Sequence, residues 1–301
     1  MISLLENLHV GNSPWETAFA GGEIANIDAK WLRICPLWIP TMKIATWNIN
    51  GIKARHDVLI AWLKEAAPDI VCLQEIKSVD ENFPASEIES LGYNVETHGQ
   101  KGFNGVALLS RLPFDEVNRG LPGDDEDVQA RFIEGVFSLN DSVLRLVSLY
   151  LPNGNPVDTE KYPYKLGWMD RLHEWAEERL ALQEPLILAG DYNIIPQDHD
   201  CWDINVWRDD ALAKPQSREK FRALCNLGFT EALRSSSDDE GIYTFWDYQA
   251  GAWPKNHGIR IDHLLMSAEA SINLGGCHVD SYVRAWEKPS DHVPVWIEYN
   301  A

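Results

Sequence analysis

Polar side chains that can bind a metal ion or transfer a proton recur at the ends of apolar, strand-like runs in this chain. Glu75 follows the run IVCLQ, and Asp191 and Asn193 follow PLILAG. Asn48 and Asn50 end the first such run, Tyr150 ends LRLVSLY, and Asp262 lies within GIRIDHLL. Asp291 and His292 precede the last run. In α/β folds, the loops at strand ends supply active-site groups, so residues distant in sequence can converge there. The pattern therefore predicts one shared pocket.

The residue types suit metal-assisted chemistry at a phosphate. Mg²⁺ requires hard oxygen ligands such as Glu75 and usually takes one or two carboxylates together with water and substrate phosphate. Asp191 could activate water or protonate a leaving oxygen, and Asn193 could donate hydrogen bonds to a phosphorane-like transition state. An imidazole used over a phosphate needs an orienting carboxylate, and Asp262 is the candidate partner of His292.

Each of these residues also has a purely structural explanation. Glu75 could be a solvated loop residue, because Glu is mostly exposed in proteins. The Gly-Asp-x-Asn sequence around Asp191 is also good turn chemistry, and the Asp-His pair could be a cap or a hydrogen-bonded buried His. Tyr150 would ordinarily be a packing residue. The argument for a catalytic site therefore depends on the set and not on any single member.

The charge balance argues against a nucleic-acid substrate. The chain has 26 Lys and Arg residues against 46 Asp and Glu residues, a net charge of -20, whereas a nucleic-acid-binding domain is expected to present a basic surface. However, a site that gathers acidic metal ligands is locally acidic, and a bound cation reverses the local sign. Most basic residues are expected to be ordinary surface charges. Those beside expected loops, where they could form a phosphate-facing patch, are Lys53, Arg55, Lys101, Arg119, Arg131, Lys161, Lys165, Lys255 and Arg260.

The cysteines and the apolar runs indicate a reduced, cytoplasmic setting. The five cysteines are widely spaced, without a C-x-x-C pair or a His cluster at zinc-ligand spacing. No apolar run approaches the ~20 residues needed to cross a bilayer. The N-terminus also lacks the basic, apolar and small-residue pattern of an export signal. We therefore expect no membrane association.

Two regions are expected along the chain. Residues 1–41 have no sustained periodicity and mix Gly, Ser, Pro and isolated Trp, which predicts a disordered leader or an extension from an alternative start. Residues 42–301 are expected to form one domain, in which strand-like runs alternate with amphipathic helical stretches, as in an α/β fold. The expected strands are 44–48, 70–74, 105–110, 144–150, 186–189, 260–266 and 293–299, and the expected helices are 53–65, 164–181 and 217–227.

The segment YTFWDYQAGAW is unusually aromatic and ends beside Lys255, Asn256 and His257. Aromatic residues beside cations can stack on or wedge into nucleic acid. Because the chain has 13 Trp residues, most of its aromatic residues must pack in the core.

Seven motifs occur along the chain in the order WNING, LQEIK, GVALLS, YLPNG, LAGDYNIIP, RIDHLL and KPSDHVPVW. Together they resemble exonuclease III and the class II AP endonucleases of the endonuclease/exonuclease/phosphatase superfamily. The resemblance runs from Met42 to about Glu298. Each string is weak alone, but seven in the same order are a specific signal.

The resemblance implies an α/β fold, a four-layer αββα sandwich of two mixed β-sheets packed face to face, with a metal-dependent site at one rim. It implies metal binding by Asn48, Glu75 and Asp291, and catalytic roles for Tyr150, Asp191, Asn193, Asp262 and His292. Whether Asp191 or His292 is the general base stays open, as does the number of metal ions. It implies substrate contacts from Asn153 and an apolar pocket for an extruded abasic sugar formed by Phe245, Trp246, Ile259 and Ile261.

The expected activity is Mg²⁺-dependent hydrolysis of DNA phosphodiesters, with Mn²⁺ as a possible substitute. It comprises incision 5′ to abasic sites, 3′→5′ removal of nucleotides from duplex DNA and clearing of blocked 3′ ends, as in base-excision repair. The expected partner is double-stranded DNA with abasic sites or 3′ ends, bound by a cytoplasmic, nucleoid-associated monomer that needs no protein partner. One alternative keeps the fold and metal but acts on a phospholipid or inositol phosphate. Another is a catalytically silent DNA-binding module.

Overall fold

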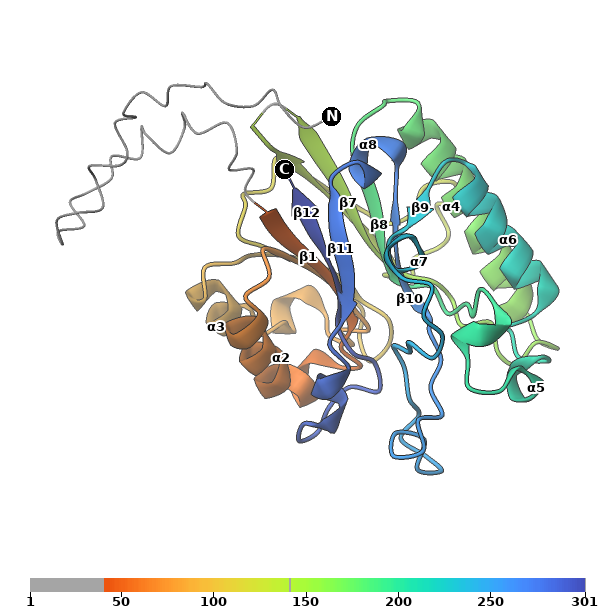
Figure 1. The fold of residues 1–301 in the computed structure, drawn as a ribbon. Helices are drawn as coiled ribbons and strands as arrows, with labels where there is room; N and C mark the ends of the chain where they lie inside the picture. The colour runs from red at the N-terminus through yellow and green to blue at the C-terminus, as the bar shows by residue number, and fades with distance from the viewer. Residues whose placement is uncertain (1–40, 141, 301) are drawn as a thin grey trace, which may run out of the picture. The chain divides into compact units, whose positions relative to one another are not determined.

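The computed structural model describes residues 41–140 and 142–300 (Figure 1). The expectation for residues 1–41 therefore falls outside the described residues, except for Thr41. Thr41 already belongs to the first strand, where it pairs with Asn300. The first described strand thus begins one residue before the expected domain boundary.

Two six-stranded mixed sheets form the centre of the fold. The first has the order β11 (Leu274–Val279), β12 (Val295–Asn300), β1 (Thr41–Asn48), β2 (Ile70–Gln74), β4 (Val106–Ser110) and β3 (Asn94–His98). The second has the order β5 (Glu116–Arg119), β6 (Phe132–Ser138), β7 (Val143–Tyr150), β8 (Leu186–Asp191), β10 (Asp262–Met266) and β9 (Thr230–Glu231). In each sheet one central pair is parallel, β1 with β2 and β7 with β8, and its other neighbours are antiparallel.

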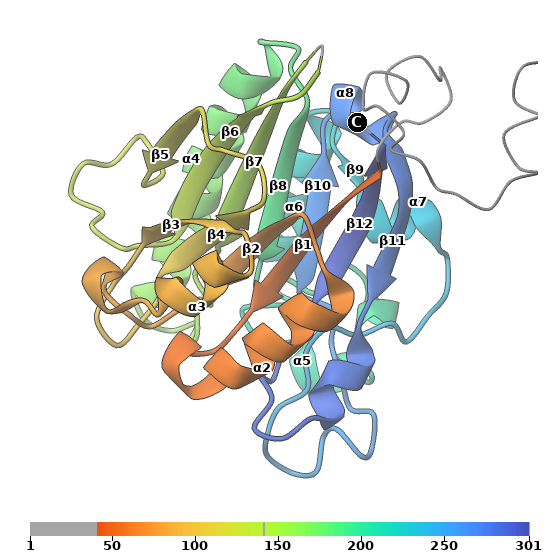
Figure 2. The same ribbon diagram turned by 90° about the vertical axis from the view of Figure 1, so that its left-hand side faces the viewer.

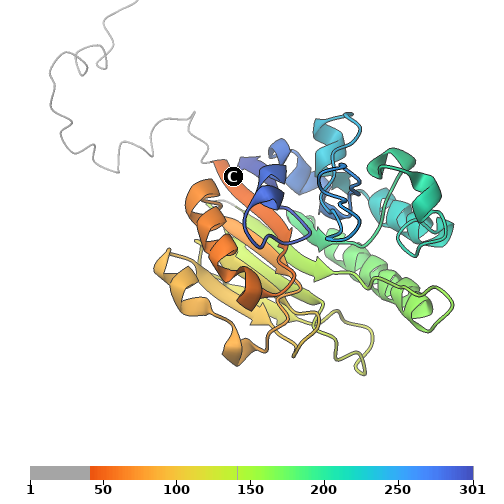
Figure 3. The same cartoon turned by 90° about the horizontal axis from the view of Figure 1, so that it is seen from below.

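Helices cover the outer face of each sheet (Figures 1 and 2). The first sheet is covered by α2 (Ile52–Ala66) and α3 (Ala85–Ser90), and the second by α4 (Lys161–Leu180) and α6 (Pro215–Asn226). Viewed from below, α2 (orange) and α4 (green) lie on opposite sides of the strands (Figure 3). The shorter helices are α5 (Ile204–Trp207), α7 (Ala232–Ser236) and α8 (Ala268–Ser271), with 3-10 turns at Asp80–Asn82, Asp198–Asp200 and Ser281–Ala285. In the described part of the chain, none of the helices is both long and apolar enough to cross a membrane.

The strand periodicity explains the layers. Because successive side chains of a strand point to opposite faces, Ile44 packs between the two sheets with Leu146, whereas Ala45 packs toward α2 with Leu59. In the second sheet, Val147 packs outward with Trp168 of α4. Each central strand is therefore buried on both faces, as the apolar runs predict. The four-layer αββα expectation is confirmed.

The expected elements are all present, with ends shifted by a few residues, but several strands were not predicted. These are β3, β5, β6, β9 and β11. The sequence of β6 is interrupted by Glu134 and Gly135, which hid its strand character. Glu134 is nevertheless buried, because its carboxylate forms an ion pair with Arg145 at 3.3 Å, a pairing that the sequence could not show.

Register brings the polar strand ends together. The parallel pairing of β1 with β2 sets Asn48 beside Gln74, the residue before Glu75. The parallel pairing of β7 with β8 sets Tyr150 beside Asp191. Since the two sheets face each other, these strand ends meet at one rim of the sandwich.

Candidate active site

Asn48 joins two acidic residues from different sheets. Its Nδ2 donates to Glu75 Oε1 and to Asp191 Oδ2, both at 2.9 Å, while its Oδ1 accepts from the backbone N–H of Asn50 at 3.0 Å. Asn48 is fully buried. With its amide oxygen engaged by the backbone, Asn48 orients the two carboxylates through its N–H groups.

The loops that carry these side chains have unusual backbone conformations. Glu75 has φ 50°, Lys77 has φ 50° and Asn193 has φ 48°. Asn is tolerated in this left-handed region, but Glu and Lys adopt it at a cost. Such strain concentrates at functional sites, where the surrounding structure holds it. Here the Glu75 carbonyl accepts from the Gly51 N–H at 2.7 Å, which holds the loop in place.

His292 is held between two carboxylates. Its Nδ1 lies 2.9 and 3.1 Å from the two oxygens of Asp262, and its Nε2 lies 3.7 Å from Asp191 Oδ2. The Trp47 indole donates to the His292 carbonyl at 3.0 Å, and the backbone N–H of His292 donates to the Ser290 hydroxyl at 3.2 Å. The expected pairing of His292 with Asp262 is thus present in the geometry, and the Nε2 edge faces Asp191.

These contacts shift the pKa values of His292 and Asp191. Burial alone would lower the pKa of His292, but the carboxylates of Asp262 and Asp191 outweigh it and raise the pKa to about 10. For Asp191, burial and then the charge of Asp262 raise the pKa to about 7, against the opposing effects of His292 and of hydrogen bonds from Asn48 and Asn193. His292 therefore holds its proton at neutral pH, whereas Asp191 can exchange one.

Tyr150 and the two amides Asn153 and Asn193 complete the rim. Burial, followed by the charges of Glu75 and Asp191, raises the pKa of Tyr150 well above its ordinary value, so its hydroxyl remains a hydrogen-bond donor. Asn153 Nδ2 donates to Asn193 Oδ1 at 2.9 Å, and the Asn193 N–H donates to Asp191 Oδ1 at 2.8 Å. Tyr150 and both amides therefore lie next to the acidic cluster.

The acidic cluster fits a hard cation. One carboxylate oxygen from each of Glu75 and Asp191 and one ring nitrogen of His292 lie within 4.8 Å of one another. Asp291, expected as a ligand, is not part of this cluster. Its Oδ1 accepts from Asn50 Nδ2 at 2.9 Å, beside the cluster. The two carboxylates supply the oxygen donors that Mg²⁺ prefers.

Lys77 is a site residue that the sequence pattern did not indicate. Its Nζ lies 2.7 Å from Glu75 Oε2 and donates to Asn50 Oδ1 at 2.5 Å. The ammonium thus compensates the Glu75 charge and, despite the raising effect of burial, lowers the Glu75 pKa together with Asn48. Its position two residues after Glu75 in LQEIK was the only available signal.

Comparison with known proteins identifies the family. The model of the endonuclease/exonuclease/phosphatase family matches residues 45–292. The chain belongs to this family. It is 36% identical over 271 residues to exodeoxyribonuclease III of Haemophilus influenzae, covering 86% of this chain and 100% of the relative. Within the family, it is therefore a hydrolase of the exodeoxyribonuclease III and AP endonuclease type.

Two solved structures share the fold over the same region. An AP endonuclease from Archaeoglobus fulgidus has a TM-score of 0.82 at 33% identity, covering 86% of this chain and 100% of that one. The 3′ phosphatase NExo from Neisseria, bound to a product DNA hairpin, has a TM-score of 0.82 at 35% identity with the same coverage. The two-sheet fold is thus that of DNA-repair nucleases.

Of the four apolar residues expected to line a substrate pocket, Phe245 lies nearest the catalytic pair. Its ring centroid is 4.9 Å from that of His292, and its backbone pairs with Ile259. Ile259 and Ile261 are buried beneath it in one small cluster. The Trp246 side chain packs in a different cluster with Tyr243, Ala252 and Val293. Only Phe245 of the four is partly exposed.

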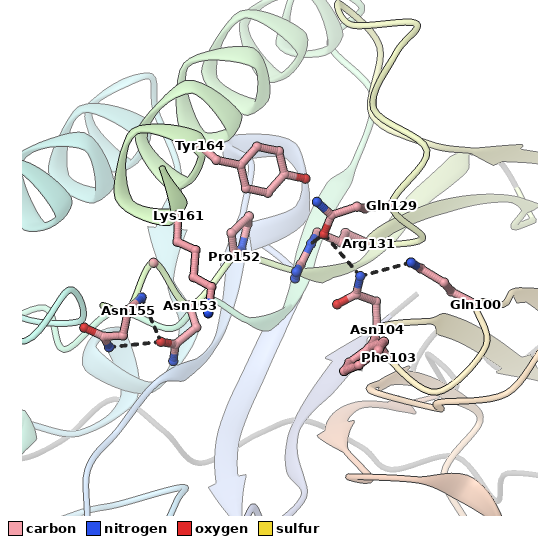
Figure 4. Close-up of a pocket in the computed structure, with 11 residues that line it drawn as sticks. Gln100, Phe103, Asn104, Gln129, Arg131, Pro152, Asn153, Asn155, Lys161 and Tyr164 are labelled. Atoms are coloured by element: carbon pink, nitrogen blue, oxygen red, sulfur yellow. Dashed lines mark hydrogen bonds between the residues drawn. The ribbon is translucent and has the colours of Figure 1, made fainter. Parts of the chain in front are cut away.

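The expected phosphate-facing patch is only partly present. Arg131 and Lys161 line an open pocket of about 430 Å³ next to the catalytic rim, together with Asn153 and the exposed Phe103 (Figure 4). Arg131 also donates to the Tyr150 carbonyl at 3.2 Å and lies over its ring. This pocket places cationic and amide side chains beside the site of an otherwise acidic protein.

Two other members of the expected patch are buried, so their assignment was wrong. Arg260 forms a bidentate pair with Asp200, at 2.9 and 3.1 Å, and contacts Glu231 at 2.8 Å. Lys165 is fully buried beneath the loop that carries Asn153. Arg260 begins the motif RIDHLL and Lys165 lies in the expected helix 164–181, and sequence position alone did not distinguish either residue from a surface charge.

Proposed function

We propose that this chain is a Mg²⁺-dependent nuclease acting on double-stranded DNA. It would incise 5′ to abasic sites, remove nucleotides 3′→5′ and clear blocked 3′ ends, as a cytoplasmic monomer. The observation that carries the proposal is the cluster of Glu75, Asp191 and His292, whose polar atoms lie within 4.8 Å of one another. The relatives support the substrate, since one of them is structurally characterised with a product DNA hairpin.

In this proposal, Glu75 is the principal metal ligand, supported by Asn48 and Asp291. Asn48 acts by orienting the Glu75 carboxylate, with which it shares a hydrogen bond. Lys77 balances the charge of Glu75 until substrate and metal are present. The bound cation would supply Lewis-acid stabilisation of charge on the scissile phosphate.

The remaining residues would transfer the proton of the attacking water and stabilise the negative charge of the transition state. Asp191 accepts the proton of the attacking water, because its carboxylate contacts both Asn48 and His292 and its raised pKa of about 7 suits proton exchange near neutral pH. His292, protonated and paired with Asp262, presents Nε2–H to a phosphate oxygen. Tyr150 donates its O–H, and the amides of Asn153 and Asn193 donate N–H groups, to oxygens whose charge increases in the transition state.

Contacts further from the reaction centre would position the duplex. Arg131 and Lys161 in the open pocket suit phosphates of the DNA backbone, and Phe103 offers an exposed ring beside them. Phe245, with Trp246, Ile259 and Ile261 behind it, would form the apolar wall met by a sugar that lacks its base. The acidic net charge remains the one argument for a non-DNA phosphoester, and the relatives do not favour that alternative.

A single assay tests the proposal. A duplex oligonucleotide with one abasic-site analogue is incubated with the protein in Mg²⁺ or in EDTA, alongside a matched duplex without the lesion. We expect a nick immediately 5′ to the analogue in Mg²⁺ only. No Mg²⁺-dependent nicking, with release of phosphate from an inositol phosphate or phospholipid instead, would replace this function with the alternative.

A further inference from the structure

Lys165 is a fully buried cation one helical turn inside α4. Its Nζ donates to the Asn193 carbonyl at 2.6 Å and to the Asn153 carbonyl at 3.1 Å. Among the described residues, no ion pair compensates its charge at a distance of 4.0 Å or less. The ammonium is thus bound by two backbone carbonyls, and these belong to the two residues whose side-chain amides face the catalytic rim.

These contacts link two loops that come from neighbouring strands. The loop after β7 carries Asn153 and the loop after β8 carries Asn193, and the two side chains are hydrogen-bonded to each other at 2.9 Å. Asn193 Nδ2 donates onward to the Leu151 carbonyl at 2.9 Å. Lys165 therefore binds the backbone of both loops, while their side-chain amides are hydrogen-bonded to each other.

The loops are built to admit this side chain. Gly154 has φ 89°, and a Cβ at this position would lie 2.7 Å from Lys165 Cδ. Any other residue would displace the lysine stem. The sequence Asn-Gly at 153–154 therefore gives both the turn and the space that Lys165 needs.

The buried amino group needs an explanation, because removing an ammonium from water is costly. Burial lowers the pKa of Lys165 to about 7, even though Asp191 and Asp210 favour the charged form. A methionine would fill the same space without this cost. The amino group provides what methionine lacks, namely N–H donors that fix two carbonyl groups at once.

We propose that Lys165 is a positioning residue that sets the orientation of the Asn153 and Asn193 amides toward the scissile phosphate. The proposal rests on the proposed nuclease function. It predicts that loss of the ammonium impairs the chemical step and leaves substrate binding intact, because the amides act on charge that develops in the transition state.

The first test replaces Lys165 by Met, which keeps the length of the stem. We expect kcat on the abasic duplex to fall on the order of 10- to 100-fold, as for small misplacements of catalytic groups. The KM and the Mg²⁺ concentration for half-maximal activity should stay unchanged. Lys220→Met on the neighbouring α6, whose ammonium pairs with Asp170 at the surface, is the matched control with wild-type kcat. Wild-type kcat in Lys165→Met would overturn the proposal.

A double-mutant cycle separates positioning from general damage. In a background where Asn153 and Asn193 are both Ala, Lys165→Met should reduce kcat no further, because the groups it positions are absent. A full additional loss in that background would show that Lys165 acts by another route.

Lys165→Gln provides a second, independent variant in case Lys165→Met shows no cooperative unfolding transition. Its amide can still donate to one carbonyl, so we expect an intermediate kcat, and a wild-type value would overturn the proposal. Wild-type enzyme in the same assay distinguishes failure of the proposed nuclease function from failure of the positioning role of Lys165. If the wild type nicks the duplex and the Lys165 variants match it, only the positioning role fails. If the wild type itself fails to nick, the proposed function fails and the positioning role with it.

Discussion

Replacing Asp262 by Asn tests the catalytic pair directly. Asn has nearly the same size and can still accept a hydrogen bond from His292 Nδ1, but it lacks the negative charge. That charge is the largest of the effects that raise the pKa of His292 from 6.5 to about 10 against the opposing effect of burial. We expect the His292 pKa in Asp262→Asn to fall toward 6.5, because Asp191 and Asp291 are then left to oppose burial.

The size of the effect follows from these values. With a pKa of about 10, His292 is almost completely protonated near pH ~7.5, whereas with a pKa near 6.5 about one tenth of it is protonated. If imidazolium contacts the phosphate, turnover at this pH falls roughly tenfold. The stability contribution of the pair is fully present below pH ~6.5 and is lost as the pH rises through about 10, since the folded-state pKa is the higher one.

The assay is an NMR titration of the imidazole nitrogens in EDTA, with His292 identified by comparison with His292→Gln. Turnover of the abasic duplex in Mg²⁺ is measured on the same preparations. Asp238→Asn, at an exposed acidic residue, is the control that should leave both quantities unchanged. A wild-type His292 that titrates near its ordinary value, or a pKa unmoved by Asp262→Asn, would refute the reasoning.

Three further predictions concern the metal ligand, the DNA contact and the buried ion pairs. Glu75→Ala should abolish turnover while duplex binding, measured by fluorescence anisotropy, survives; equal loss of both would point to misfolding or a different role. Lys161→Met should weaken duplex binding and reduce the slope of log Kd against log salt by about one, as expected for one lost phosphate contact, and an unchanged slope would remove Lys161 from the interface. Arg260 lowers the pKa values of Asp200 and Glu231 to about 2, against the raising effect of burial. The stability that these two carboxylates give the folded protein should therefore be present above pH ~4.5 and should be lost as the pH falls toward ~2. Arg260→Met should cost about 3–5 kcal/mol in urea unfolding at neutral pH, because two carboxylates lose their partner, and a cost below about 1 kcal/mol would contradict this.

Local pattern was enough to find most of the fold. The runs IVCLQ and PLILAG are apolar at every position but the last, because β2 and β8 lie between a helix layer and the opposite sheet. The helical spacing of Val58, Leu59 and Trp62 matches the buried face of α2. Edge strands such as β5 were missed because one side is exposed and their sequences lack a continuous apolar signal.

Chemical type and order along the chain indicated which residues could serve the reaction. A carboxylate after a strand, or a His beside an Asp, can be recognised from sequence because residue type and order along the chain are visible without the fold. The sequence thus determined the family, the reaction type and the candidate groups, including Glu75, Asp191 and His292.

Only the tertiary structure decided how those groups are partnered. The bonds from Asn48 to Glu75 and Asp191, the ion pair of Lys77 and the placement of Asp291 beside the cluster all depend on register between strands and on packing between sheets. Lys165 and Arg260 show most clearly what sequence could not predict, since each was expected to be a surface cation and each is buried. Whether a charge is buried is set by segments that are distant in the chain, and no local pattern carries that information.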